Sequence, residues 1–139
     1  GFEAAAIAGP LTVQAEYMQM SVSRSIGSDL DFTSWYATAG VFLTGETRDY
    51  SESRGVIGGP RHIEHRWGAI EVAVRYGTLD LEDQDVTGGQ EDNFGIALNW
   101  YVNNNVRFML NYIHFDASPA NTGIDQDGNI VAVRLQLVL

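Results

Sequence analysis

The chain has 139 residues, no cysteine and a formal net charge of −10 at pH 7, and all of its basic residues except histidine are arginine. This composition excludes a disulfide framework and thiolate metal sites, and the net charge argues against contacts with the phosphates of nucleic acids. Glycine is abundant at 15, proline is scarce at 3, and no run approaches the 18 apolar residues of a transmembrane helix, so the composition fits an all-β membrane structure as well as a soluble core.

The first third of the chain contains three predicted strands, over residues 2–8, 11–21 and 32–44. The turn pair Gly9-Pro10 ends the first strand, and a polar loop separates the other two. Apolar residues occupy alternate positions in the second and third strands, and successive side chains on a strand point to opposite faces. Each of these two strands therefore has one apolar face.

The middle of the chain is less regular. A long irregular stretch is predicted over residues 45–66, which contain several glycines and four arginines. A strand follows over residues 67–81, with Ile and Val on one face and Ala, Glu and Arg on the other. Residues 80–92 are rich in Asp and Glu and are predicted to form an acidic loop.

The clearest pattern is a hairpin of two alternating strands, over residues 93–102 and 106–115, joined by three asparagines. In its first strand one face is wholly apolar, with Phe94, Ile96, Leu98, Trp100 and Val102. Each strand is about 10 residues long, the length that crosses a bilayer when tilted. A loop over residues 117–126 then leads to a seventh strand that alternates to the C-terminus.

Seven strands with hairpin-compatible connections predict an antiparallel meander. Alternation alone also fits a soluble β-sandwich, since both structures have one apolar face. Long apolar alternation, aromatic residues near strand ends and a last strand that alternates to its end favour a transmembrane barrel. Seven strands would leave two open edges in lipid, so we expect residues 1–139 to be the C-terminal part of one larger barrel domain.

The loops predict an orientation for this barrel. In bacterial barrels the periplasmic turns are short and the extracellular loops are longer. The turn at residues 103–105 should then be periplasmic, and the loops at 22–31, 80–92 and 117–126 should be extracellular. The stretch 45–66 is the exception, because it is a long connection on the periplasmic side.

Three stretches in order carry a family resemblance: residues 42–46, residues 67–76 and the hairpin from Asn99 to Tyr112. Together they resemble the C-terminal region of the phosphate-selective porin O and P family. The resemblance implies a trimeric, sixteen-stranded outer-membrane barrel that passes small anions. In that family a ladder of arginines, a lysine cluster and an inward-folded loop build the constriction. This chain has no lysine, and it ends in Leu139 where an aromatic residue is usual.

Arg75, Arg107 and Arg134 are the candidate substrate-binding residues. Each occupies a polar position on a different strand, so all three are expected to face the lumen. Arginine on the lipid face near the midplane would cost about 2–4 kcal/mol, which supports this assignment. A basic track of this kind lowers the barrier for anions. The alternative is that these arginines only balance the negative charge of Glu71, of Glu16 and of the trimer wall.

Other polar groups have less specific readings. The acidic stretch 80–92 could bind divalent cations that bridge to lipopolysaccharide, but a solvated surface loop is favoured. His62 and His65 form an H-x-x-H pair without an obvious third ligand, and they are expected to pack under the barrel or to bind peptidoglycan. A catalytic triad around His114 is not expected, since nothing shapes an oxyanion hole. Residues 125–129 resemble part of a calcium loop that lacks its bidentate Glu.

The sequence therefore predicts an all-β, antiparallel transmembrane β-barrel with about seven of sixteen strands present. The expected function is diffusion of small solutes, anions such as phosphate above all, through a water-filled lumen without catalysis or a cofactor. The expected location is the bacterial outer membrane, as a homotrimer in contact with lipid and lipopolysaccharide and not with nucleic acid. Two alternatives remain open: a general or cation-preferring porin, suggested by the acidic total, and an envelope β-sandwich that binds carbohydrate.

Overall fold

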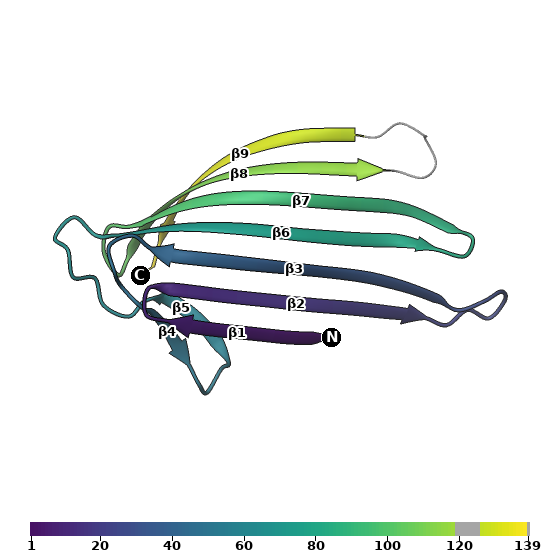
Figure 1. The fold of residues 1–139 in the computed structure, drawn as a ribbon, viewed down its shortest axis with the longest axis horizontal. Helices are drawn as coiled ribbons and strands as arrows, with labels where there is room; N and C mark the ends of the chain where they lie inside the picture. The colour runs from purple at the N-terminus through teal and green to yellow at the C-terminus, as the bar shows by residue number, and fades with distance from the viewer. Residues whose placement is uncertain (119–125, 139) are drawn as a thin grey trace.

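A computed structural model describes residues 1–118 and 126–138 and shows a curved antiparallel sheet with a small hairpin beside it (Figure 1). Seven strands form the sheet, in the order β1-β2-β3-β6-β7-β8-β9. Their bounds are β1 Phe2–Ala8, β2 Leu11–Val22, β3 Leu30–Phe42, β6 Ala69–Asp83, β7 Val86–Tyr101, β8 Val106–Ser118 and β9 Gln126–Leu137. The prediction of an all-β antiparallel fold with these seven strands is confirmed.

β1 and β9 are the two edges of the sheet, and within the described residues neither pairs with a further strand. An open edge presents a row of unpaired backbone N–H and C=O groups. Over residues 1–118 and 126–138 the structure contains no helix that is long and apolar enough to cross a membrane.

The register places the polar positions of the seven strands on one face of the sheet, which we call the polar face. Glu71 of β6, for example, lies opposite Phe42 of β3 on one side and Asn99 of β7 on the other. The opposite, apolar face carries large side chains that are 40–45% exposed, among them Ile96, Leu98, Trp100, Phe108 and Leu110. An exposed apolar surface of this extent marks a face that contacts lipid or another protein.

The predicted hairpin is confirmed as β7 and β8, and its asparagine turn is held by side-chain hydrogen bonds. The Asn103 carbonyl oxygen accepts from the backbone N–H groups of Asn105 and Val106, each at 2.9 Å. The Asn105 amide in turn donates to the Val138 carbonyl at 2.7 Å, so the turn also fixes the end of the chain next to β9. These contacts explain why asparagine occupies the turn.

The predicted acidic loop over residues 80–92 is wrong. β6 continues to Asp83 and β7 begins at Val86, so only Gln84 and Asp85 lie between the two strands. Gln84 has a φ of 52°, which allows this tight connection. β7 has 16 residues instead of the predicted 10, and β6 continues two residues beyond its predicted end at residue 81. The hydrogen bonds between two strands are made by backbone groups and do not require apolar side chains. Charged residues on both faces of a stretch therefore indicate the end of a strand in water and not a loop.

The prediction that residues 45–66 are irregular is also wrong, because they contain the antiparallel strands β4 (Arg48–Ser51) and β5 (Val56–Pro60). We call residues 45–66 the inward segment, since they fold over the polar face. Among the described residues, a buried apolar cluster lies at this contact and consists of Phe42, Ala69 and Tyr101, with Ile63 of the inward segment packed against it.

Gly68 lies between the inward segment and β6 and returns the chain to the sheet. Its φ is +99°, a region that favours glycine, and a Cβ atom there would lie 2.2 Å from the carbonyl oxygen of Tyr101. The indole N–H of Trp100 donates to the carbonyl of Trp67 at 2.8 Å and holds the same junction. Position 68 therefore requires glycine both because its φ is positive and because a Cβ atom would clash with the carbonyl of Tyr101.

Candidate functional site

The polar face contains one fully buried carboxylate, that of Glu71 in β6. Its Oε1 accepts from Nε and Nη2 of Arg48 at 3.0 and 2.5 Å. Its Oε2 accepts from the amide of Asn99 at 2.9 Å and from the hydroxyl of Tyr101 at 3.4 Å. A buried charge is tolerated only when it is paired and hydrogen-bonded, and here both oxygens of the carboxylate have partners.

Arg48 comes from β4, so the Arg48–Glu71 pair joins the inward segment to the sheet. The guanidinium also donates from Nη1 to the carbonyl of Gly58 in β5 at 2.6 Å, which ties the two strands of the hairpin together. Its Cζ lies 5.7 Å from the centre of the Phe42 ring. Arg48 is therefore fully engaged by protein groups.

Gly40 of β3 makes room for this pair. A Cβ atom at position 40 would lie only 2.9 Å from Oε1 of Glu71, closer than real side chains approach. β3 thus has no side chain at the point where the carboxylate of Glu71 lies against it. A glycine in a strand often marks such a close approach.

The start of the inward segment is anchored separately. The hydroxyl of Thr44 accepts from the backbone N–H of Ile70 at 3.1 Å and is hydrogen-bonded to the buried carboxylate of Glu46. His65 contacts the carbonyl of Thr44 through Nε2 at 3.3 Å, and its ring stacks on Trp67 with centroids 5.2 Å apart. Thr44 therefore links the start of the segment to β6, and His65 links the two ends of the segment to each other.

The three arginines singled out from the sequence all lie on the polar face by register. Arg107 lies opposite Gln136 of β9, two residues from Arg134, so these two are diagonal neighbours on adjacent strands. Arg75 lies six residues along β6 from Ala69, which is level with Arg107, and this separation is about 20 Å along the sheet. The structure therefore groups Arg107 with Arg134 and places Arg75 apart.

Two of these guanidinium groups lie over tyrosine rings. The Cζ of Arg75 is 3.8 Å from the centre of the Tyr36 ring, and the Cζ of Arg107 is 4.6 Å from that of Tyr101. A ring face orients a cation without neutralising its charge. The Nε of Arg107 is buried and has no hydrogen-bond partner.

Within the described residues, none of these three arginines forms a salt bridge with a carboxylate. The ion pairs found there are Arg24–Asp85, Arg48–Glu71 and Arg61–Asp49. The carboxylate of Glu71 is thus balanced by Arg48 of the inward segment and not by the strand arginines. This leaves the charge of the strand arginines uncompensated by direct contact.

The Arg48–Glu71 pair was missed by the sequence analysis. Its partners are 23 residues apart and lie in different strands of different sheets, so no spacing rule brings them together. The only available signals are a carboxylate at a polar position in mid-strand and an asparagine in the matching position of the next predicted hairpin. Those signals indicate a buried polar contact but do not identify its partner.

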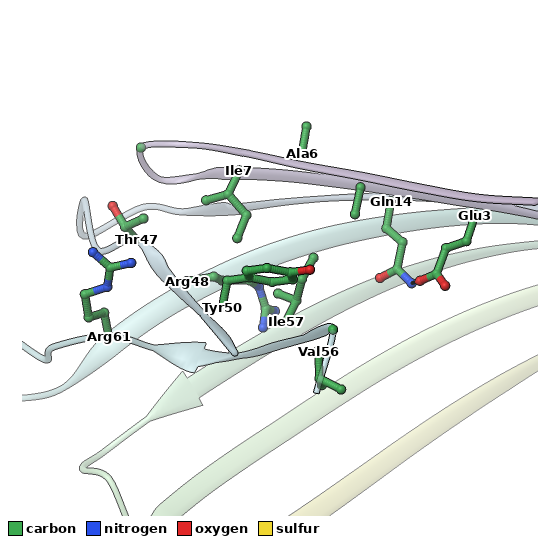
Figure 2. A pocket seen from close by; sticks show the side chains of 13 residues that line it. Glu3, Ala6, Ile7, Gln14, Thr47, Arg48, Tyr50, Val56, Ile57 and Arg61 are labelled. Atoms are coloured by element: carbon green, nitrogen blue, oxygen red, sulfur yellow. Dashed lines mark hydrogen bonds between the residues drawn. The ribbon is translucent and has the colours of Figure 1, made fainter. Parts of the chain in front are cut away.

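The inward segment leaves hollows on the polar face. One of about 990 Å³ lies between the hairpin and β1–β2 and is lined by polar groups such as Glu3, Gln14, Arg48 and Arg61 (Figure 2). Figure 2 shows the side chains of Tyr50 and Ile57 within it. A second hollow of about 350 Å³ lies between β5 and the β7–β8 turn and is lined by Arg61, Arg107 and Gln136, among others.

The end of the sheet far from the inward segment is acidic, and an ion pair joins two of its turns. Arg24, in the turn after β2, contacts Asp85, in the turn after β6, with an Nη2–Oδ1 distance of 2.6 Å and an Nη1–Oδ2 distance of 3.0 Å. The hydrogen bond from Arg24, together with a backbone hydrogen bond, lowers the pKa of Asp85. The backbone N–H of Asp31 also donates to Asp83 at 2.7 Å, so the neighbouring ends of β3 and β6 are joined as well.

The remaining sequence candidates are dispersed. His114 lies on the apolar side of β8, and its Nδ1 contacts the side-chain oxygen of Asn129 at 3.0 Å. In the part of the chain that the structure describes, no group of three or more His, Cys, Asp or Glu side chains could hold a metal ion. Asp125 of the calcium-loop fragment, most of the predicted loop 117–126 and Leu139 lie outside the described residues.

Comparison with known proteins agrees with this architecture. The chain is 30% identical to Porin O of Pseudomonas aeruginosa over 99% of its own length and 34% of that protein. It is 35% identical to an uncharacterized protein of Caulobacter vibrioides over 99% of its length and 29% of that protein. The chain thus spans about a third of the length of these relatives. The sequence model of phosphate-selective porin O and P matches residues 1–139, and the chain therefore belongs to this family.

Proposed function

We propose that this chain forms part of the wall of an outer-membrane porin that lets small anions, phosphate among them, diffuse through a water-filled lumen. The observation that carries the proposal is the set of Arg75, Arg107 and Arg134 on one face of the sheet, without carboxylate partners among the described residues. Unpaired guanidinium groups on a pore wall lower the barrier for anions and form bidentate contacts with phosphate.

The rest of the barrel belongs to the same proposal. The open edges of β1 and β9 would be continued by further strands, up to the sixteen expected, because an unpaired edge is not stable in lipid. The apolar face would then contact lipid, lipopolysaccharide or the other subunits of a trimer. Family membership and the exposed apolar side chains support this arrangement.

A cation-preferring or unselective porin is the second candidate. It is favoured by the net charge of −10 and by the acidic end of the sheet, where Asp83 and Asp85 lie in and beside one turn. The carbohydrate-binding β-sandwich is not retained, since the described sheet has no second layer over its apolar face and the family is that of a porin.

The test is the reversal potential of the complete protein in a planar bilayer under a KCl gradient, with and without added phosphate. An anion-selective potential and a chloride current that phosphate blocks would support the proposal. Arg107→Met and Arg134→Met should each reduce anion selectivity, whereas Arg24→Met, at the far end of the sheet, should change it less. A cation-selective or unselective pore that phosphate does not affect would overturn anion selectivity in favour of the second candidate.

A further inference from the structure

We propose that the Arg48–Glu71 pair is a latch that positions the β4–β5 hairpin over the polar face, and that breaking the pair releases the hairpin. Glu71 would then act as a positioning residue for passage through the pore, without touching the solute. The effect on passage rests on the proposed porin function, whereas the position of the hairpin does not.

The hairpin is attached to the sheet through one cluster of side chains. In the part of the chain that the structure describes, the hydrogen bonds that join β4–β5 to the sheet converge on Arg48 and Glu71, with Asn99 and Tyr101 as further donors to the carboxylate. Arg48 also binds the carbonyl of Gly58 in β5, so one side chain connects the sheet with both strands of the hairpin. Losing either charged partner would remove the central attachment.

The hairpin is bordered by empty space among the described residues. Hollows of about 990 and 350 Å³ lie on its two sides, and a third of about 160 Å³ lies beside the pair itself, lined by Thr12, Gly40 and Ala73, among others. A close-packed element cannot move without clashes, because protein interiors are dense. Among the described residues the hairpin has room on each side, and apart from the apolar contact of Ile63 its place is fixed by the Arg48–Glu71 contact.

The two side chains of the latch are largely shielded from water. The side chain of Glu71 is fully buried and that of Arg48 is 17% exposed, so neither charge is solvated when its partner is removed. Truncating one partner of a buried pair leaves the other charge uncompensated. The hairpin can relieve this cost by moving outward, which carries Arg48 into water.

The experiment measures the position of the hairpin directly. Spin labels at Ser53→Cys in the hairpin tip and Asn104→Cys in the β7–β8 turn report one distance across the polar face; both sites are exposed and this chain has no native cysteine. Double electron–electron resonance is recorded on the complete, cysteine-free protein in lipid. The latched form should give a single narrow distance distribution.

Glu71→Gln and Arg48→Met should each broaden this distribution or add a second population. Arg54→Met is the matched control, because it removes the same charge from the tip of the same hairpin, where the side chain is exposed. A narrow distribution in both latch variants would overturn the proposal, and so would equal broadening in Arg54→Met. If Glu71→Gln fails to fold, Arg48→Met, which changes the hairpin and leaves the sheet intact, still decides the outcome.

Single-channel recording then separates the latch from the porin function. Release should increase the current noise of the open channel in the two latch variants and not in Arg54→Met. If the unmodified protein shows no conductance while the latch variants still broaden the distances, the porin function fails and the latch stands. If conductance is present and the distances do not change, the porin function stands and the latch fails.

Discussion

The seven-stranded sheet and the inward segment are ordered by different interactions. In the sheet each strand is held by a long backbone ladder, and large side chains on its apolar face are exposed. In the inward segment the ladder is limited to two short strands, and order comes from side chains such as Arg48, Glu71 and Ile63. A ladder depends on the backbone alone, so it tolerates many sequences. Side-chain contacts depend on particular residues, and single substitutions should separate the two regions.

Glu71→Ala should have the largest effect and should act on the inward segment. It leaves the Arg48 guanidinium without its carboxylate and removes the acceptor for Asn99 and Tyr101. Breaking a buried pair in this way costs about 3–5 kcal/mol in the free energy of unfolding. Urea titration of the protein in lipid vesicles measures this loss.

Glu82→Ala is the control, since it removes an exposed carboxylate from the same strand. It should change the free energy of unfolding by less than about 0.5 kcal/mol, as is usual for surface positions. Equal effects of the two substitutions would mean that the inward segment contributes no more to stability than the sheet surface, and the contrast between the two regions would be lost.

Gly40→Ala should have the next largest effect, although it lies in the sheet. The added methyl group would be 2.9 Å from Oε1 of Glu71 and would push the carboxylate away from Arg48. Overpacking of this kind costs about 1–3 kcal/mol. Gly95→Ala, in β7, is the matched control because its nearest contact would be an ordinary 3.7 Å. The same unfolding titration should show a loss for position 40 and little change for position 95.

The same contrast explains what the sequence could predict. Alternation in stretches such as residues 93–102 reports which backbone runs are extended and which positions share a face, and the register bears this out. Charge alone did not mark a loop, since β6 and β7 continue through residues 80–92. The β4–β5 hairpin could not be predicted, because its position depends on the contact between Arg48 and Glu71, which no local pattern encodes.

Asp116→Asn should have a smaller effect, and one of opposite sign. Asp116 of β8 lies directly opposite Asp92 of β7 and Asp127 of β9, which puts three carboxylates in one row across the sheet. Like charges in opposed positions destabilise a sheet, so removing the central one should stabilise the protein by about 0.2–1 kcal/mol at low salt. Added salt should reduce the gain, because it screens exposed charges. A gain that is independent of salt would contradict the electrostatic explanation.

The smallest expected effect concerns the ion pair between the two turns at the acidic end. Its hydrogen bond from Arg24 lowers the pKa of Asp85, so the folded protein holds this proton less tightly than the unfolded chain. The pair therefore contributes stability above the ordinary aspartate pKa of about 3.9, and this contribution is lost as the pH falls through the lowered value. NMR titration of the Asp85 carboxyl carbon should show a midpoint below the ordinary value. Arg24→Met should return that midpoint towards it, and Arg54→Met should leave it unchanged. Because neither side chain is fully buried, the two turns are expected to separate at low pH while the backbone ladder stays folded. At this end of the sheet too, the response to pH would then be limited to side-chain contacts.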